Sequence, residues 1–280
     1  MFNFLRGHPN GSLLPVEEMQ EIFSKIGASS NQERLLESLN YMEDDRGDPD
    51  LLDELSDFME RHTWTDDIGI PPIEDDIEIS NERPTDLFIT HGVSHGIDIL
   101  CTAQTKRGDV VMMERPTYFL AADIFLSHGL QIKSLPMKIS GGIDVDRLEQ
   151  LLESKEMTPP RMIYIIPTHQ NPTALTMGIN DRWKLAVIAA RHGILVLADE
   201  VYHLLDWRDE KIDGRRPARM AVLGSRVASN RGRSQLGCCI TVSSFTKIFA
   251  PGVRCGWIEG PKEIIDSLLS LGYIQSQVGS

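Results

Sequence analysis

Residues 161–200 read RMIYIIPTHQNPTALTMGINDRWKLAVIAARHGILVLADE, and this stretch decides the expected fold. Two short apolar runs, at 161–167 and 194–200, flank a segment with helical periodicity at about 181–192. Runs that are apolar on both faces are typical of strands buried in a parallel sheet, and neighbouring parallel strands need a crossover between them. The stretch therefore predicts a strand, a helix and a second strand of an α/β protein.

The same alternation continues in both directions along the chain. It predicts further strands at 86–90, 109–114, 130–136, 238–244 and 253–260, and further helices at 94–106, 117–127 and 144–154. We therefore expect a mostly parallel sheet sandwiched by helices over 63–280. Residues 1–62 predict an N-terminal arm with helices at 16–26, 33–42 and 50–62.

Two polar stretches interrupt this pattern. Residues 66–84 are acidic and marked by prolines, so they predict a surface loop. Residues 208–237 are rich in arginine and lack a strong period, which is typical of an inserted loop. The arginines can form a solvated excursion or a docking surface for an acidic partner.

The composition limits the class of protein. The chain of 280 residues has a formal net charge of −13, which argues against non-specific binding to nucleic acid or anionic membranes. No apolar run approaches the roughly 20 residues needed to cross a bilayer, and no signal peptide is evident. The four cysteines lack zinc-ligand spacing and predict reduced core thiols: Cys101, Cys238, Cys239 and Cys255. We therefore expect a cytoplasmic protein without a metal site.

Polar residues and glycines follow the first predicted strands, at the edge where ligands collect in an open parallel sheet. After 86–90 comes Gly92-Val93-Ser94, and a glycine turn into a helix lets backbone N–H groups face an anion. After 109–114 comes Tyr118, which presents an aromatic ring. Taken singly, the first can also be a plain turn and the second can be packing.

Two later strands also end in polar side chains. Asn171 follows 161–167 in an Asn-Pro turn, and Asp199 follows five apolar residues, with Tyr202 three positions on. A carboxylate in such a position is expected to be buried, so it needs a partner or its pKa rises. A charged heterocycle nitrogen would serve as that partner, whereas a helix N-cap is the alternative role for Asp199.

Lys247 follows the strand predicted at 238–244, in the sequence SSFTKIFAPGVR. A lysine held in apolar surroundings has a lowered pKa and becomes a nucleophile toward aldehydes, although a solvated surface lysine is the alternative. Ser244 precedes it, and Arg254 follows where it could clamp a phosphate.

These groups are more specific together than singly. Lys247 offers an amine for a Schiff base and Asp199 an acid for a pyridinium nitrogen. Asn171 and Tyr202 offer an amide and a phenol for a ring oxygen, and Tyr118 offers a ring that can stack. Serine, arginine and a glycine-rich turn remain for a phosphate. This is the set of groups that pyridoxal phosphate requires.

On these residues the chain resembles the class I/II aminotransferases, which are pyridoxal-phosphate enzymes of fold type I. SSFTKIFAPGVRCGW (243–257) is similar to the family segment Ser-x-Ser-Lys-x-x-Ala-Pro-Gly-x-Arg-x-Gly-Trp. QNPT (170–173) and LADEVYHLL (197–205) are similar to Asn-Pro-Thr-Gly and Asp-Glu-x-Tyr, and RGDVVMMERPTYF (107–119) to Gly-Asp-x-Val-x-x-Glu-x-Pro-x-Tyr. The resemblance runs from about Phe4 to Ser280, and it implies the large domain of fold type I over 63–280.

The resemblance implies catalytic roles for three residues. Lys247 would form the Schiff base with the cofactor and move a proton between the substrate α-carbon and the cofactor. Asp199 would keep the pyridine nitrogen protonated. Tyr202, with Asn171, would hydrogen-bond the phenolic oxygen, and Tyr118 would stack on the ring.

The phosphate and the substrate would be bound by other segments. The resemblance assigns the phosphate to N–H groups of Gly92, Val93 and Ser94, completed by Ser244 and Arg254. It implies a homodimer, since Tyr41 is similar to the tyrosine that reaches the phosphate of the neighbouring subunit, and it assigns residues 1–62 to the small domain and the dimer interface. Gly7, with Asn171, would lie near the substrate carboxylate, although Gly7 can also be a simple turn glycine.

The chain departs from the family pattern in two places. Ala174 stands where the family has glycine after Asn-Pro-Thr, at a position that can need an unusual backbone angle. The family continues for roughly another hundred residues beyond LGYIQSQVGS (271–280), and these carry the arginine that pairs with the substrate carboxylate. We therefore expect the C-terminal small domain to be truncated in this chain.

Three activities remain open from the sequence. The first is an aminotransferase that moves an amino group between an L-amino acid, aromatic or 2-aminoadipate-like, and a 2-oxo acid. The second is a pyridoxal-phosphate C–S lyase, because the cofactor does the chemistry and the pocket selects the bond that breaks. The third is a truncated form that binds the cofactor without turnover.

Overall fold

A computed structural model describes residues 9–28, 32–40, 44–63, 77–78, 86–205, 217–229 and 239–272 of the chain. At residues 62–63, 77–78 and 228–229 it describes the backbone alone. Gly7, Tyr41, Cys238 and most of the arginine-rich stretch lie outside the described residues, so the predictions made for them are untested.

The centre of the fold is a seven-stranded sheet with the strand order β2-β9-β8-β6-β5-β3-β4. Neighbouring strands run parallel except at β9, which is antiparallel to both β2 and β8. The mostly parallel sheet predicted from the sequence is therefore confirmed. The strands are β2 (Asp86–Thr90), β3 (Val110–Met113), β4 (Gln131–Ser134), β5 (Met162–Ile165), β6 (Leu195–Asp199), β8 (Cys239–Ser244) and β9 (Gly256–Gly260).

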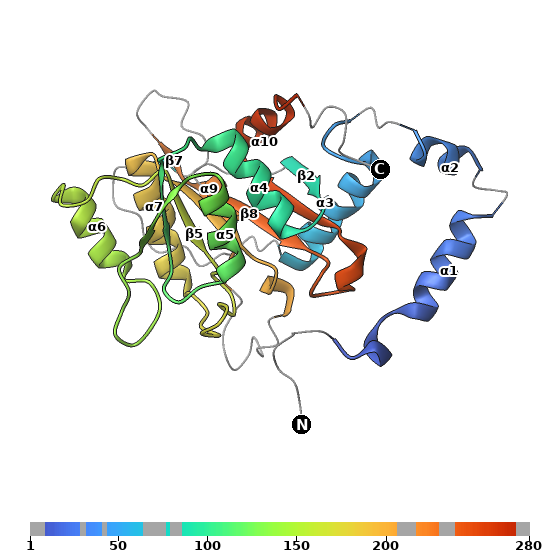
Figure 1. The fold of residues 1–280 in the computed structure, drawn as a ribbon, viewed down its shortest axis with the longest axis horizontal. Helices are drawn as coiled ribbons and strands as arrows, with labels where there is room; N and C mark the ends of the chain where they lie inside the picture. Colours follow the sequence, from blue (N-terminus) through green and yellow to red (C-terminus); the bar gives the residue numbers. More distant parts are fainter. Residues whose placement is uncertain are drawn as a thin grey trace.

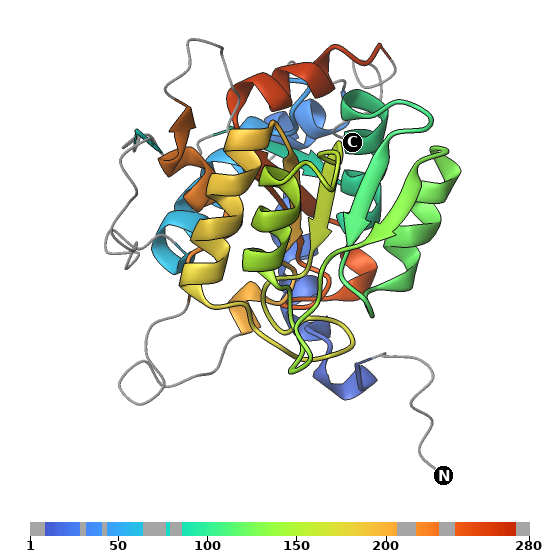
Figure 2. The same cartoon turned by 90° about the vertical axis from the view of Figure 1, so that its left-hand side faces the viewer.

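Helices cover both faces of this sheet, and the layers are visible in Figures 1 and 2. On one face lie α6 (Val145–Glu153), α7 (Ile179–His192) and α9 (Met220–Arg226), whose buried side chains form one core cluster with the sheet. On the other lie α4 (Val93–Gln104), α5 (Phe119–Ser127) and α10 (Lys262–Leu269), which form a second cluster. The predicted sandwich is confirmed.

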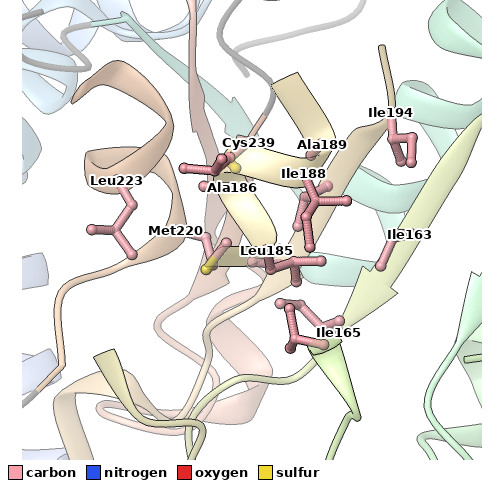
Figure 3. Packing of buried hydrophobic residues seen from close by; sticks show 14 of the residues in the cluster. Ile163, Ile165, Leu185, Ala186, Ile188, Ala189, Ile194, Met220, Leu223 and Cys239 are labelled. Carbon is pink, nitrogen blue, oxygen red and sulfur yellow. The ribbon is translucent and has the colours of Figure 1, made fainter. Parts of the chain in front are cut away.

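Figure 3 shows how buried hydrophobic side chains pack on the first of these two faces of the sheet. Ile163 and Ile165 of β5 face Leu185 and Ile188 of α7, and all four are completely buried. Residues two apart on a strand point to one face, whereas residues three or four apart share one face of a helix. The strand and helix periods in 161–200 therefore produce the crossover that the sequence predicted.

The N-terminal residues form α1 (Val16–Ile26), α2 (Gln32–Ser38) and α3 (Pro49–Thr63). α3 buries Leu52, Leu55 and Met59 against Leu87 and Trp257 of the sheet. α1 and α2 extend away from the body of the molecule in Figure 1, and neither buries a residue. Apolar side chains of α1 are therefore exposed to solvent, and Phe23, for example, is 64% exposed.

Both polar stretches contain structure that the sequence analysis missed. β1 (Ile77–Glu78) lies within the predicted loop 66–84 and pairs with β7 (Ala228–Ser229) within the predicted loop 208–237. α9 also lies in the latter stretch, because its apolar residues 220–224 are buried against the sheet. The prediction of plain loops was wrong there, since a two-residue strand and a seven-residue helix are too short to give a clear period.

The described residues include no helix that is long and apolar enough to cross a membrane. They also include no group of three or more potential metal ligands. Cys101 and Cys239 are buried, as the prediction of core cysteines requires, and Cys255 is half-buried.

Candidate active site

A cavity of about 160 Å³ opens beyond the carboxyl ends of the central strands. Nine residues predicted for the site line it, namely Val93, Ser94, Tyr118, Asn171, Asp199, Tyr202, Ser244, Lys247 and Arg254. Ile166, Val201 and Thr246 complete its wall and were not predicted. Side chains that are up to 161 positions apart in sequence, at 93 and 254, thus share one pocket, which is the arrangement expected at the strand ends of an α/β sheet.

The part of the cavity near Gly92 and Arg254 favours the binding of an anion. It lies at the N-terminus of α4, where the first backbone N–H groups have no partner inside the helix and the helix dipole is positive. Gly92 immediately precedes α4 with φ 94°, a conformation that favours glycine. Arg254 comes from the loop before β9, and its Nη2 donates a 2.9 Å hydrogen bond to the carbonyl oxygen of His91.

Close backbone packing holds this part of the cavity together. A Cβ atom added at Gly92 would lie 2.9 Å from Nη2 of Arg254, and one added at Gly256 would lie 2.8 Å from Cα of Gly92. Ser244 is buried, and its hydroxyl lies 2.7 Å from that of Thr246 and donates to the carbonyl oxygen of Cys255 at 2.8 Å. Gly92 and Arg254, which were both predicted to bind a phosphate, therefore lie side by side.

Asp199, the last residue of β6, also lines the cavity. Its side chain is buried, and its Oδ2 accepts a 2.9 Å hydrogen bond from the hydroxyl of Tyr164. Burial raises the pKa of Asp199 to about 6, while the hydrogen bonds from Tyr164 and from the N–H of Val201 and the charge of Lys247 act in the opposite direction. The alternative that Asp199 caps a helix is not realised, because only a 3-10 turn (η3, His203–Leu205) follows. Its carboxylate is thus a buried acid that faces a cavity.

Aromatic and amide groups also line the cavity. Burial raises the pKa of Tyr202, as does the charge of Asp199, whereas a hydrogen bond with the Asn171 side chain lowers it. Tyr118 directly precedes α5 and is half-buried. A planar ring placed here would meet a phenol, an amide and an aromatic face.

Lys247 lies in the turn after β8, and its Nζ is 5.9 Å from the centre of the Tyr202 ring. The residue is exposed, and its neighbour Phe249 is 39% exposed. The expectation that apolar side chains enclose Lys247 was therefore wrong for this chain.

The turn that carries Asn171 is held by a charge that is completely buried. Arg182 of α7 donates to the carbonyl oxygens of Pro167 and Met177 at 2.7 and 2.8 Å, one on each side of Asn171 along the chain. It also pairs with Glu200 at 3.3 Å, and neither side chain has any exposed area. Arg182 thus ties the turn that carries Asn171 to the residue that follows Asp199.

A second polar cluster joins this turn to the Tyr118 segment. Gln170 donates to the carbonyl oxygen of Pro116 at 2.8 Å and accepts from the N–H of Thr173 at 2.8 Å. Glu114 accepts from the N–H of Ile166 at 2.9 Å, and burial raises its pKa to about 7. Sequence reasoning missed Glu114, although it follows an apolar strand in the same way as Asp199.

Ala174 occupies the position where an unusual backbone angle was anticipated. Its φ is 60°, in the left-handed region, and its N–H donates to the carbonyl oxygen of Gln170 at 2.6 Å. A non-glycine residue in this conformation is disfavoured by about 1 kcal/mol. The turn nevertheless forms with alanine at this position.

Comparisons with known proteins identify similar sequences. The family model for aminotransferases of class I and II matches residues 12–273. An aromatic amino acid aminotransferase of Schizosaccharomyces pombe is 27% identical over 285 residues, which cover 96% of this chain and 59% of that protein. An aminotransferase of Arthroderma benhamiae is 32% identical over 187 residues, covering 65% of this chain and 38% of that protein.

A solved structure shares the fold. The kynurenine aminotransferase of Pyrococcus horikoshii, crystallised with PMP, superposes with a TM-score of 0.71 at 25% sequence identity, covering 95% of this chain and 57% of that one. The chain therefore spans less than two thirds of the length of these relatives.

Proposed function

Because the chain belongs to the class I and II aminotransferase family, we propose that it binds pyridoxal 5'-phosphate and acts as an aminotransferase. The substrates would be an L-amino acid, aromatic or 2-aminoadipate-like, and a 2-oxo acid. The observation that carries this proposal is the single cavity that Asp199, Lys247 and Arg254 share at the sheet edge. The names of the S. pombe and P. horikoshii relatives support the aromatic class of substrate.

The donor set of the cavity fits this cofactor. Arg254 and the N-terminus of α4 provide cationic character where a phosphate would bind, and Gly92 leaves room there that a Cβ atom would fill. Asp199 provides a buried carboxylate in the same cavity, and the protonated nitrogen of a pyridine ring is a suitable partner for it. The cavity thus offers a cationic partner for a phosphate and an anionic partner for a ring nitrogen.

The cofactor would supply an aldehyde that condenses with amines and a ring that accepts electrons from the substrate α-carbon. Nζ of Lys247 would be the amine that holds the cofactor, and it would also take up the proton at the substrate α-carbon. Asp199 would hold a proton on the ring nitrogen. Tyr202 and Asn171 would donate to the ring oxygen, and Tyr118 would cover one face of the ring.

We further infer that the chain works as a homodimer in the cytoplasm. The exposed apolar residues of α1, including Phe23 at 64%, support an interface that this arm helps to build. Tyr41 would reach the phosphate of a neighbouring subunit and Gly7 the substrate carboxylate, although both lie outside the described residues. Residues 1–62 would then be the arm and 63–280 the large cofactor-binding domain.

Borohydride trapping tests the proposed cofactor site. The purified chain is mixed with pyridoxal phosphate, reduced with borohydride and digested, and the peptides are mapped by mass. A pyridoxyl adduct on Lys247 is the expected result, and the Lys247→Arg variant is the matched control. An adduct spread over surface lysines, equal in the variant, would refute the proposal.

Product analysis then separates the activities. Incubation with an aromatic amino acid and 2-oxoglutarate should give a new oxo acid and glutamate in equal amounts. Ammonia and pyruvate from a cysteine conjugate would instead indicate C–S lyase chemistry. Trapping on Lys247 without either product would leave a cofactor-binding form without turnover.

A further inference from the structure

A buried tyrosine lies behind the acid of the site. Tyr164 lies within β5, and its register partner on β6 is Leu197. Aligned residues of neighbouring parallel strands point to one face, and so do residues two apart. Tyr164 and Asp199 therefore share the face that α4 and α5 cover, and the Tyr164 hydroxyl reaches Oδ2 of Asp199 at 2.9 Å.

The surroundings of Tyr164 make it the donor in this hydrogen bond. The side chain has no exposed area, and its ring packs edge-on against Phe125 of α5 at 5.6 Å between ring centres. Burial raises the pKa of Tyr164 well above its ordinary value, and the charge of Asp199 raises it further. The phenol thus keeps its proton and acts as the donor to the carboxylate.

The two carboxylate oxygens of Asp199 are used differently. Oδ2 is occupied by Tyr164, whereas Oδ1 receives only a long 3.4 Å contact from the N–H of Val201. Since Asp199 also lines the cavity, the geometry leaves Oδ1 for a bound group. A donor on one oxygen stabilises the charged carboxylate and lowers its affinity for a proton.

We propose, building on the function proposed above, that Tyr164 is a positioning residue whose hydroxyl holds Asp199 as a carboxylate, so that a shared proton stays on the cofactor ring nitrogen. A buried acid and base can share one proton as an ion pair or as a neutral pair. Burial favours the neutral pair, which would leave the ring without its positive charge. The Tyr164 hydrogen bond favours the ion pair.

Other titratable groups act on the same carboxylate, but by charge. The charge of Lys247 stabilises the charged form of Asp199. Burial raises the pKa of Tyr118 and of Tyr202, and the charge of Asp199 raises each further. The charge of Glu114, which follows β3, favours the protonated form of Tyr164. Among the described residues, Tyr164 is the side chain that donates a hydrogen bond to Asp199.

The test replaces Tyr164 with Phe, which keeps the ring and removes the hydroxyl. The first readout is the pH midpoint of the Asp199 carboxyl carbon, measured by ¹³C NMR on the full chain without added cofactor and assigned with Asp199→Asn. A hydrogen bond to a charged group changes an equilibrium by about 10- to 100-fold, so the midpoint should rise by about one to two pH units. The second readout is the ¹⁵N signal of the ring in pyridoxal phosphate bound to the chain, which should move from the protonated toward the neutral position.

The matched control is Phe125→Leu, which disturbs the packing of Tyr164 and leaves its hydroxyl in place. It should lower stability without moving either signal. An unchanged carboxyl midpoint in Tyr164→Phe overturns the inference, and so does a moved midpoint with an unmoved ring signal. If the unaltered chain takes up no pyridoxal phosphate, the proposed function falls, and this inference falls with it.

Discussion

Replacing Asp199 with Asn is expected to stabilise the cofactor-free chain at neutral pH. Asp199 is buried beside the cavity, and burial raises its pKa from 3.8 to about 6. The folded chain thus binds this proton more tightly than the unfolded chain does. The stabilisation from that proton is fully present below pH 3.8 and is lost as the pH rises through 6.

The size of the effect follows from the shift in pKa. A difference of about two units corresponds to about 3 kcal/mol of unfolding free energy at pH 8. Asn has no charge to bury, and its side-chain oxygen can still accept from the Tyr164 hydroxyl. The difference in stability between Asp199→Asn and the unaltered chain should therefore grow from near zero at pH 4 to about 3 kcal/mol at pH 8.

Urea unfolding of both proteins from pH 4 to pH 8 measures this difference. Glu114 and the other titrating groups contribute equally to the two proteins, so they cancel in the comparison. Saturating pyridoxal phosphate should reverse the order at pH 8, because the unaltered chain then gains a partner for its carboxylate. A stability difference that does not change with pH would refute the reasoning about Asp199.

Three further substitutions test other parts of the structure. Ala174→Gly should raise the unfolding free energy in urea by about 1 kcal/mol, because the residue has φ 60°; no gain would mean that the turn is not strained. Gly92→Ala should weaken binding of pyridoxal phosphate by tenfold or more, since its Cβ would meet Arg254, and should leave binding of unphosphorylated pyridoxal unchanged; an equal loss for both would argue against a phosphate site. Arg219 and Glu259 form a buried ion pair, with Nη2 2.9 Å from Oε1. Arg219→Met should lower the unfolding free energy in urea by about 3 to 5 kcal/mol because it leaves Glu259 buried without its partner, and adding Glu259→Met should recover most of that stability.

Much of the fold was determined by local sequence patterns. The strands and helices of 161–200 were predictable because side-chain burial repeats every two residues in a strand and every 3.6 in a helix. Several cavity residues, such as Asn171, Asp199 and Lys247, were predictable because they come at or after the ends of apolar strands, and parallel strands bring those ends to one edge.

Short elements and interior partners could not be predicted in the same way. β7 and α9 lie in a polar, arginine-rich stretch and are too short to show a period. Tyr164 stands in an uninterrupted apolar run, where its hydroxyl gives no signal until β6 brings Asp199 beside it. Arg182 reads as a surface residue of an amphipathic helix, yet it is completely buried.

The residues of the sheet and the polar groups at its edge were predictable from the chain, because those properties depend on neighbours in sequence. The strand order β2-β9-β8-β6-β5-β3-β4, the hydrogen bonds of Arg182 around the Asn171 turn and the exposure of Lys247 became clear only from the folded structure. Each of these depends on contacts between segments that are distant in sequence, where burial turns an ordinary polar side chain into one that must find a specific partner.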